Sequence, residues 1–113
     1  MQVIFESRDA DATQIRKLSI DRVRFVLRRL SALVPRAKVL YSDVNGPRGG
    51  VDKRCQVELR TDGARTVVIA SLAGDWRTAL DRSLARAARA LTRSLRRSQK
   101  PTRGRAAKLA LES

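Results

Sequence analysis

Five arginines in the C-terminal half of the chain are spaced so that they can bind a polyanion together. Arg82, Arg86, Arg89, Arg93 and Arg97 are three or four residues apart. At about 100° per residue, this spacing places all five on one side of a helix. Guanidinium groups bind phosphate in a bidentate manner, and like charges at helical spacing repel one another. Phosphates would relieve that repulsion and release counterions, so the row predicts a nucleic-acid-binding face.

A basic helix of this kind has two other interpretations. A merely solvated helix face is the ordinary reason for a run of charges. A basic amphipathic helix can also lie on a membrane, but here the apolar side is needed to pack on a sheet and aromatic residues make up only 4% of the chain. The same scarcity of aromatic residues argues against recognition by base stacking. We therefore expect contacts to phosphates and to RNA shape.

The composition of the whole chain supports a polyanionic partner. The 113 residues, enough for one domain, include 25 Lys and Arg against 11 Asp and Glu, which gives a net charge of +14. Histidine is absent and Cys55 is the single cysteine, so the usual His-based triads and zinc sites are excluded. We expect no enzyme activity, no metal, no cofactor, no small-molecule substrate and no membrane partner. The N-terminus shows no signal peptide, which predicts a cytoplasmic protein.

The elements that would position the arginines follow from periodicity. Apolar residues at helical spacing predict a helix over residues 13–33, which Pro35 ends. Its apolar face is formed by Ile15, Leu18, Val26, Leu30 and Leu33. Its opposite face carries Lys17, Arg24 and Arg28.

A second helix is predicted from Asp75, as the capping residue, to residue 98. Its apolar stripe comprises Trp76, Leu80, Leu84, Ala87, Ala88, Leu91 and Leu95. Strands are predicted at residues 2–6, 37–44, 55–60 and 65–71. The order β-α-β-β-β-α indicates an α+β two-layer sandwich, a four-stranded sheet with two helices on one face. Residues 1–98 would form this domain, and residues 99–113 a basic, disordered C-terminal tail.

The segment 45–54 is a candidate phosphate-contacting loop. It places glycines beside Arg48, Lys53 and Arg54, and glycine can expose backbone N–H groups to phosphate. It lacks the Gly-Lys-Ser/Thr of a Walker loop, and a plain hairpin connection explains it equally well. Cys55, in the alternating strand that follows, is expected to be a core residue rather than a nucleophile.

In the order of these elements and in several short segments, the chain resembles the short form of a known family. The family comprises the ribosome hibernation promoting factors and ribosome-associated inhibitors, also called sigma-factor modulation proteins. The resemblance covers residues 1–100. Its best part is the segment 75–81 (DWRTALD), followed by Leu84, Arg86, Arg89, Leu91 and Arg93. Met1-Gln-Val at the start, and Thr13 with Ile15-Arg16-Lys17-Leu18, are similar to the first strand and first helix of the family. The loop 45–54 departs from the shorter members.

The resemblance implies a protein that binds small-subunit ribosomal RNA, with ribosomal proteins as further contacts, in the channel used by messenger and transfer RNA. Such proteins block translation in stress or stationary phase. The contacts it implies are Arg16, Arg22, Arg86, Arg89, Arg93 and Arg97. The basic face of the first predicted helix adds Lys17, Arg24 and Arg28 as candidate contacts. Arg82 is a candidate only because it belongs to the arginine row of the second helix. Because the long C-terminal domain of some members is missing, pairing of ribosomes by this chain alone is not expected. The alternative is a generic duplex RNA- or DNA-binding module, or a protein-binding regulator of transcription.

Overall fold

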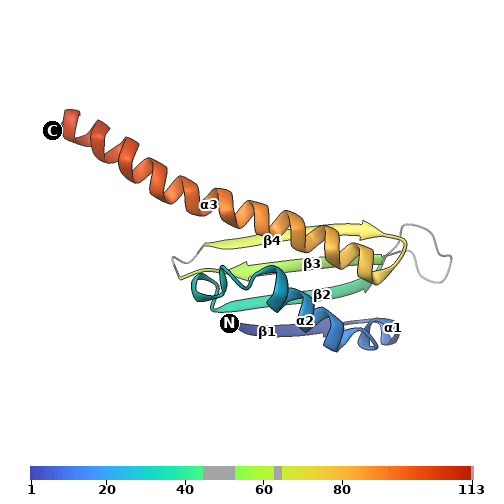
Figure 1. Ribbon diagram of the computed structural model, residues 1–113. Helices are drawn as coiled ribbons and strands as arrows, with labels where there is room; N and C mark the ends of the chain where they lie inside the picture. The colour runs from blue at the N-terminus through green and yellow to red at the C-terminus, as the bar shows by residue number, and fades with distance from the viewer. Residues whose placement is uncertain (45–52, 63–64, 113) are drawn as a thin grey trace.

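A computed structural model describes residues 1–44, 53–62 and 65–112, with side chains except those of residues 10, 11 and 97–112. Within these residues, four strands and three α-helices follow one another, with one 3₁₀ helix, η1, between α2 and β2 (Figure 1). The elements are β1 (Gln2–Ser7), α1 (Ala10–Thr13), α2 (Arg16–Val26), η1 (Ser31–Leu33), β2 (Arg36–Asp43), β3 (Lys53–Arg60), β4 (Thr66–Ala73) and α3 (Trp76–Glu112).

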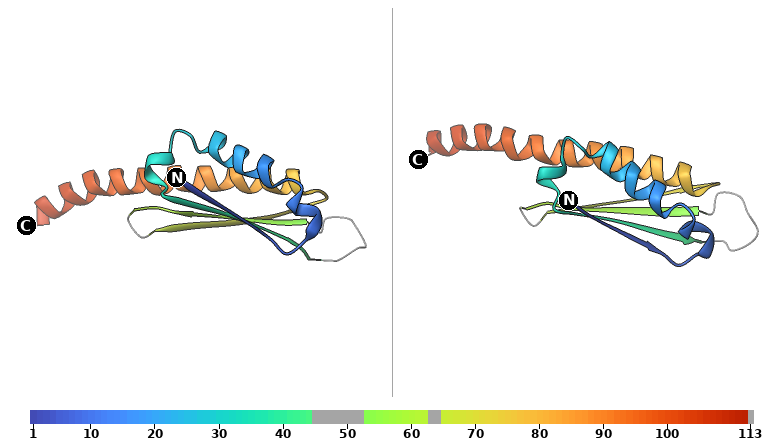
Figure 2. Two further views of the ribbon diagram at one scale, coloured as in Figure 1. Left: turned by 90° about the horizontal axis from the view of Figure 1, so that it is seen from below. Right: turned by 60° about the horizontal axis from the view of Figure 1, so that its bottom comes forward.

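The strands form one mixed sheet in the order β1-β2-β3-β4. β1 runs parallel to β2, with Gln2 opposite Arg36, because the chain crosses over through α1 and α2. β2, β3 and β4 form an antiparallel meander, with Arg36 opposite Arg60 and Arg60 opposite Thr66. α2 and α3 cover the same face of the sheet, and no other described element covers the opposite face, here called the open face (Figure 2). The predicted α+β two-layer sandwich is therefore confirmed.

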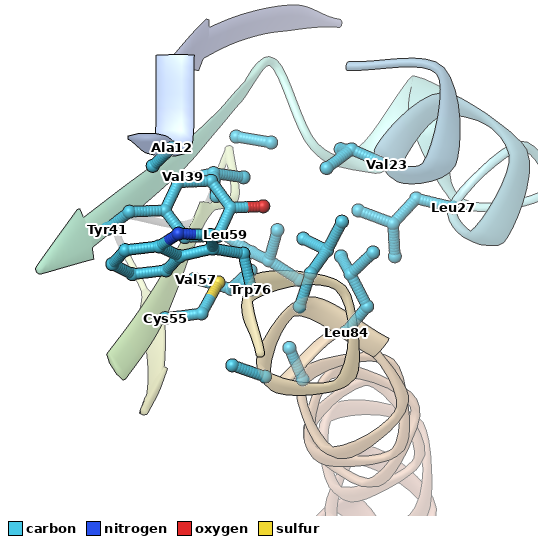
Figure 3. Packing of buried hydrophobic residues seen from close by; sticks show 14 of the residues in the cluster. Ala12, Val23, Leu27, Val39, Tyr41, Cys55, Val57, Leu59, Trp76 and Leu84 are labelled. Atoms are coloured by element: carbon cyan, nitrogen blue, oxygen red, sulfur yellow. The ribbon is translucent and has the colours of Figure 1, made fainter. Parts of the chain in front are cut away.

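The core lies between the sheet and the two helices. Alternate residues of β2 and β3, such as Val39, Tyr41 and Val57, are fully buried, as the period of two in the sequence predicts. Leu80, Leu84 and the other leucines of the predicted α3 stripe pack on them, with Leu95 partly buried (Figure 3). Three aromatic rings join this core: Tyr41 lies 5.5 Å, centroid to centroid, from both Phe5 and Trp76.

Two buried serines connect the helices to the sheet. The Ser19 hydroxyl of α2 is hydrogen-bonded to the Tyr41 hydroxyl at 2.6 Å and donates to the carbonyl of Ile15 at 2.7 Å. On α3, the Ser83 hydroxyl donates to the backbone carbonyl of Cys55 at 2.7 Å. Because a buried hydroxyl without a partner is costly, these bonds fix how each helix is rotated on the sheet.

The first helical region differs from the single helix predicted over residues 13–33. The α-helix ends at Val26, and the chain then tightens into turns in which Leu30 N–H donates to Leu27 O and Leu33 N–H to Leu30 O, both at 2.9 Å. Such i→i+3 bonds commonly close a helix before a proline. The apolar face is also rotated: Val23 and Leu27 are fully buried, whereas Leu33 is 43% exposed.

The second helix begins where predicted and continues through Glu112, beyond residue 98. Side chains beyond Arg96 lie outside the described part of the chain. The division into a domain and a separate tail at residues 99–113 therefore stays a prediction.

Candidate nucleic-acid interface

Helix α3 begins with a well-formed cap that sets the position of the arginine row. The Asp75 carboxylate accepts hydrogen bonds from the backbone N–H and the hydroxyl of Thr78, both at 2.8 Å. The N–H bond is the main reason that the pKa of Asp75 lies below its ordinary value. The predicted cap is confirmed. With the leucine stripe held against the sheet, the arginines must lie on the sides of the helix that face solvent.

The row arginines whose side chains are described are all exposed: Arg82, Arg86, Arg89 and Arg93. Arg82 Nη1 donates to the carbonyl of Leu72 at 3.1 Å. Arg86 Nη1 donates to the carbonyl of Ala70 and to the Ser71 hydroxyl, both at 3.2 Å. All three acceptors belong to β4, an edge strand whose outward carbonyls have no strand partner among the described residues. The edge therefore positions two guanidinium groups, and each keeps further N–H donors for an anion.

The row continues away from the sheet edge with fewer contacts. Arg89 Nε makes a long hydrogen bond of 3.4 Å to the carbonyl of Ala85, one turn back. Arg93 is exposed and makes no ion pair within the described part of the chain. The side chain of Arg97, the last member of the predicted row, lies outside it. A hollow of about 730 Å³ is lined by residues 70–72 of β4 together with Arg82, Arg86 and Arg89.

Helix α2 and the turn after it contribute the basic residues predicted for the first helix. Arg16, Lys17, Arg24 and Arg28 are all exposed. Arg22 differs from them, because its guanidinium faces α3 and pairs with Asp81 at 3.2 Å. The rotation of the helix explains this position, since Arg22 lies beside the true apolar face formed by Val23 and Leu27. The structure thus places Arg22 between the two helices, half-buried.

The helical layer, defined as α2, α3 and the residues between α2 and β2, carries a large excess of exposed positive charge. Its exposed basic residues are Arg16, Lys17, Arg24, Arg28, Arg29, Arg77, Arg82, Arg86, Arg89, Arg93 and Arg96. Among the described side chains of this layer, the acids are Asp21, which is exposed, and Asp81, which is paired with Arg22. Asp75 stands just before α3. Charge of one sign is therefore left without compensation over both helices.

Of the candidate phosphate-contacting loop 45–54, the structure describes Lys53 and Arg54, which belong to β3 and not to the helical layer. Arg48 lies outside the described residues. Lys53 Nζ forms a mostly buried ion pair with Asp43 at 2.7 Å and lies 5.1 Å from the Trp76 ring centroid. Arg54 donates to the Gln56 side chain at 2.8 Å, and both residues lie on the open face of the sheet. Arg54 also lines the hollow at the β4 edge together with Arg82, Arg86 and Arg89, whereas Lys53 contacts Asp43 and Trp76.

Sequence reasoning missed several members of the layer. Arg29, Arg77 and Arg96 are exposed there, and Arg96 follows Arg93 at the same helical spacing, a signal that could have identified it. It also missed Phe25, which is 57% exposed beside Arg28. Phe25 was missed because the apolar face predicted for the first helix was rotated from the one in the structure. The predicted face did not define which side of the helix Phe25 occupies.

The one thiol of the chain lies in the core. Cys55 is fully buried, as expected for a core residue, and burial is the main cause that raises the pKa of its thiol to about 12. Within the described part of the chain, no group of three or more His, Cys, Asp or Glu residues could hold a metal ion. No helix among the described residues is long and apolar enough to cross a membrane.

The geometry defines an α+β sandwich with a cationic helical layer, and two solved structures share this fold. One is a ribosomal subunit interface protein from Coxiella burnetii, with a TM-score of 0.66 and 12% identity over 83% of this chain and 97% of that one. The other is the N-terminal domain of Protein Y from Thermus thermophilus, with a TM-score of 0.60 and 23% identity over 82% and 98% of the two chains. No family model and no curated protein matches the sequence.

Proposed function

We propose that this protein binds the small ribosomal subunit through its helical layer and silences translation. In this proposal the layer contacts ribosomal RNA in the channel for messenger and transfer RNA, and it excludes both by its bulk. The observation that carries the proposal is the uncompensated positive charge over α2 and α3. The shared fold supports it, because one of the similar structures is named for the interface between ribosomal subunits. The expected setting is stress or stationary phase, in the cytoplasm.

The arrangement of the arginines suits a contact with phosphates rather than with base edges. Arg82 and Arg86 are held against the edge of β4, with remaining donors directed to solvent. Arg89, Arg93 and Arg96 continue the row along α3 at a spacing of about one helical turn, about 5 Å. Phosphates along one RNA strand can follow such a row, and each one bound releases counterions.

A charge-reversal pair tests the proposal against a matched control. The test variant is R89E/R93E, because both side chains are exposed and neither hydrogen-bonds to the described strands of the sheet. The control is R36E/R60E, which changes the net charge equally on the open face, where the two residues lie opposite each other. Co-sedimentation with small subunits and inhibition of in vitro translation should be lost in the test variant and retained in the control.

Other results would contradict the proposal. Equal losses in both variants would mean that total charge, not the helical layer, determines binding. Unchanged binding of R89E/R93E would remove the α3 row from the interface. Binding to generic duplex RNA as tight as to small subunits would instead favour a general nucleic-acid-binding module.

A further inference from the structure

Phe25 is the one aromatic residue that the fold leaves in solvent. The chain has four aromatic residues, and Phe5, Tyr41 and Trp76 pack against one another in or beside the core. Phe25 is instead 57% exposed on the last turn of α2, within the helical layer. Since core packing does not require it there, the ring is available to an external partner.

The ring is held by cationic neighbours. The Arg28 guanidinium carbon lies 4.3 Å from the ring centroid, and Arg28 Nη1 donates to the carbonyl of Phe25 at 2.7 Å. The Arg22 guanidinium carbon lies 6.0 Å from the same centroid, and its ion pair with Asp81 on α3 limits its movement. Contacts of this kind attract a cation to an aromatic face and restrict the rotamers of both side chains. An ordered aromatic ring therefore stands beside guanidinium groups on the basic layer.

We infer that Phe25 and Arg28 form a stacking site for one unpaired nucleobase of RNA. This inference rests on the proposed function. A nucleotide offers both features that the site would recognise, a π-face for the ring and a phosphate for the nearby arginines. Arg24 and Arg29, also exposed, are one and four residues from Phe25 in the sequence, and this further positive charge disfavours a plain apolar partner. The site would add a contact to a base to a surface that otherwise binds phosphates.

Stacking and phosphate contacts have different salt signatures, and the test uses that difference. Each stacked base contributes about 5- to 150-fold in affinity, whereas the loss of a phosphate contact lowers the slope of log K against log salt by about 0.7–0.9. The variants are F25A, F25L and F25W, with R93Q as the control for a phosphate contact. Binding is measured on small subunits and on protein-free small-subunit ribosomal RNA, across several salt concentrations.

We expect F25A and F25L to weaken binding to both targets by at least about 5-fold without changing the salt slope. F25W should bind as well as the wild type, and RNA should quench the added indole fluorescence after subtraction of the Trp76 signal. R93Q should reduce the slope. The melting temperature of F25A and F25L should match that of the wild type, because Phe25 is mostly exposed.

Three results would overturn the inference. If F25L binds as well as the wild type, apolar contact suffices and stacking is not involved. If F25A loses affinity for intact subunits but not for protein-free RNA, Phe25 contacts a protein. If the wild type binds both targets in a salt-dependent manner and F25A is unchanged, the stacking site fails while the proposed function stands. Failure of the wild type to bind either target would refute both.

Discussion

Replacing Arg89 with glutamine should make the protein more stable while weakening its binding. Arg89 lies three residues after Arg86 and four before Arg93, so it takes part in two like-charge pairs on α3. Each such pair destabilises a helix by about 0.2–0.5 kcal/mol, and glutamine has a helix propensity similar to that of arginine. The long hydrogen bond from Arg89 to Ala85 is exposed and contributes little. R89Q should therefore raise the free energy of unfolding by about 0.4–1 kcal/mol.

Thermal unfolding measured by circular dichroism tests this magnitude. For a domain of this size the gain corresponds to a rise in melting temperature of about 2–8 °C at low salt. The gain should disappear in 1 M salt, where the screening length falls to about 3 Å. R86Q serves as the comparison: it removes two like-charge pairs too, but it also loses the contacts to Ala70 and Ser71, so it should gain less. A lower stability of R89Q, or a gain that salt does not reduce, would refute the idea that the row is under electrostatic strain.

Other predictions concern the core beneath the interface. L84A should lower the free energy of unfolding, measured by chemical denaturation, by about 2–5 kcal/mol, because Leu84 is fully buried. A loss under about 1 kcal/mol would contradict the described packing. Cys55 should resist thiol reagents at pH 8 in the folded protein and react after unfolding, because burial raises the pKa of its thiol to about 12. Rapid labelling of the native state would contradict this prediction. The same raised pKa affects stability at high pH, because the folded state keeps the Cys55 proton that the unfolded state, with a thiol pKa of 9.0, releases. The free energy of unfolding should therefore fall as pH rises from about 9 towards 12, by up to about 1.4 kcal/mol per pH unit. C55A should show a shallower decline.

The sequence was most informative where one face of an element is buried. The alternation in β3 and the leucine stripe of α3 predicted the sheet, the packing of α3 and the exposure of Arg82 to Arg93. The Asp75 cap was predictable because a side-chain acceptor before an apolar period satisfies the free N–H groups of a helix start.

The first helix was predicted less well, because local periodicity there was ambiguous. The sequence suggested one orientation of the helix, with an apolar face formed by Ile15, Leu18, Val26 and Leu30. In the structure, however, the buried Ser19 hydroxyl is hydrogen-bonded to the Tyr41 hydroxyl, a contact across 22 residues that no local pattern reveals. That contact rotates α2, turns Arg22 towards Asp81 and leaves Phe25 in solvent. Likewise, only the sheet order shows that β4 is an edge whose carbonyls hold Arg82 and Arg86.

The most direct test of the central claim is sedimentation of the purified protein with small ribosomal subunits through sucrose gradients at several salt concentrations. The helical layer predicts binding whose log K falls with log salt at a slope of about −3 to −7, equivalent to roughly four to eight phosphate contacts. The same protein should bind generic duplex RNA more weakly at each salt concentration. A slope near zero, or affinity for duplex RNA equal to that for small subunits, would contradict the claim that this layer is built for the ribosome.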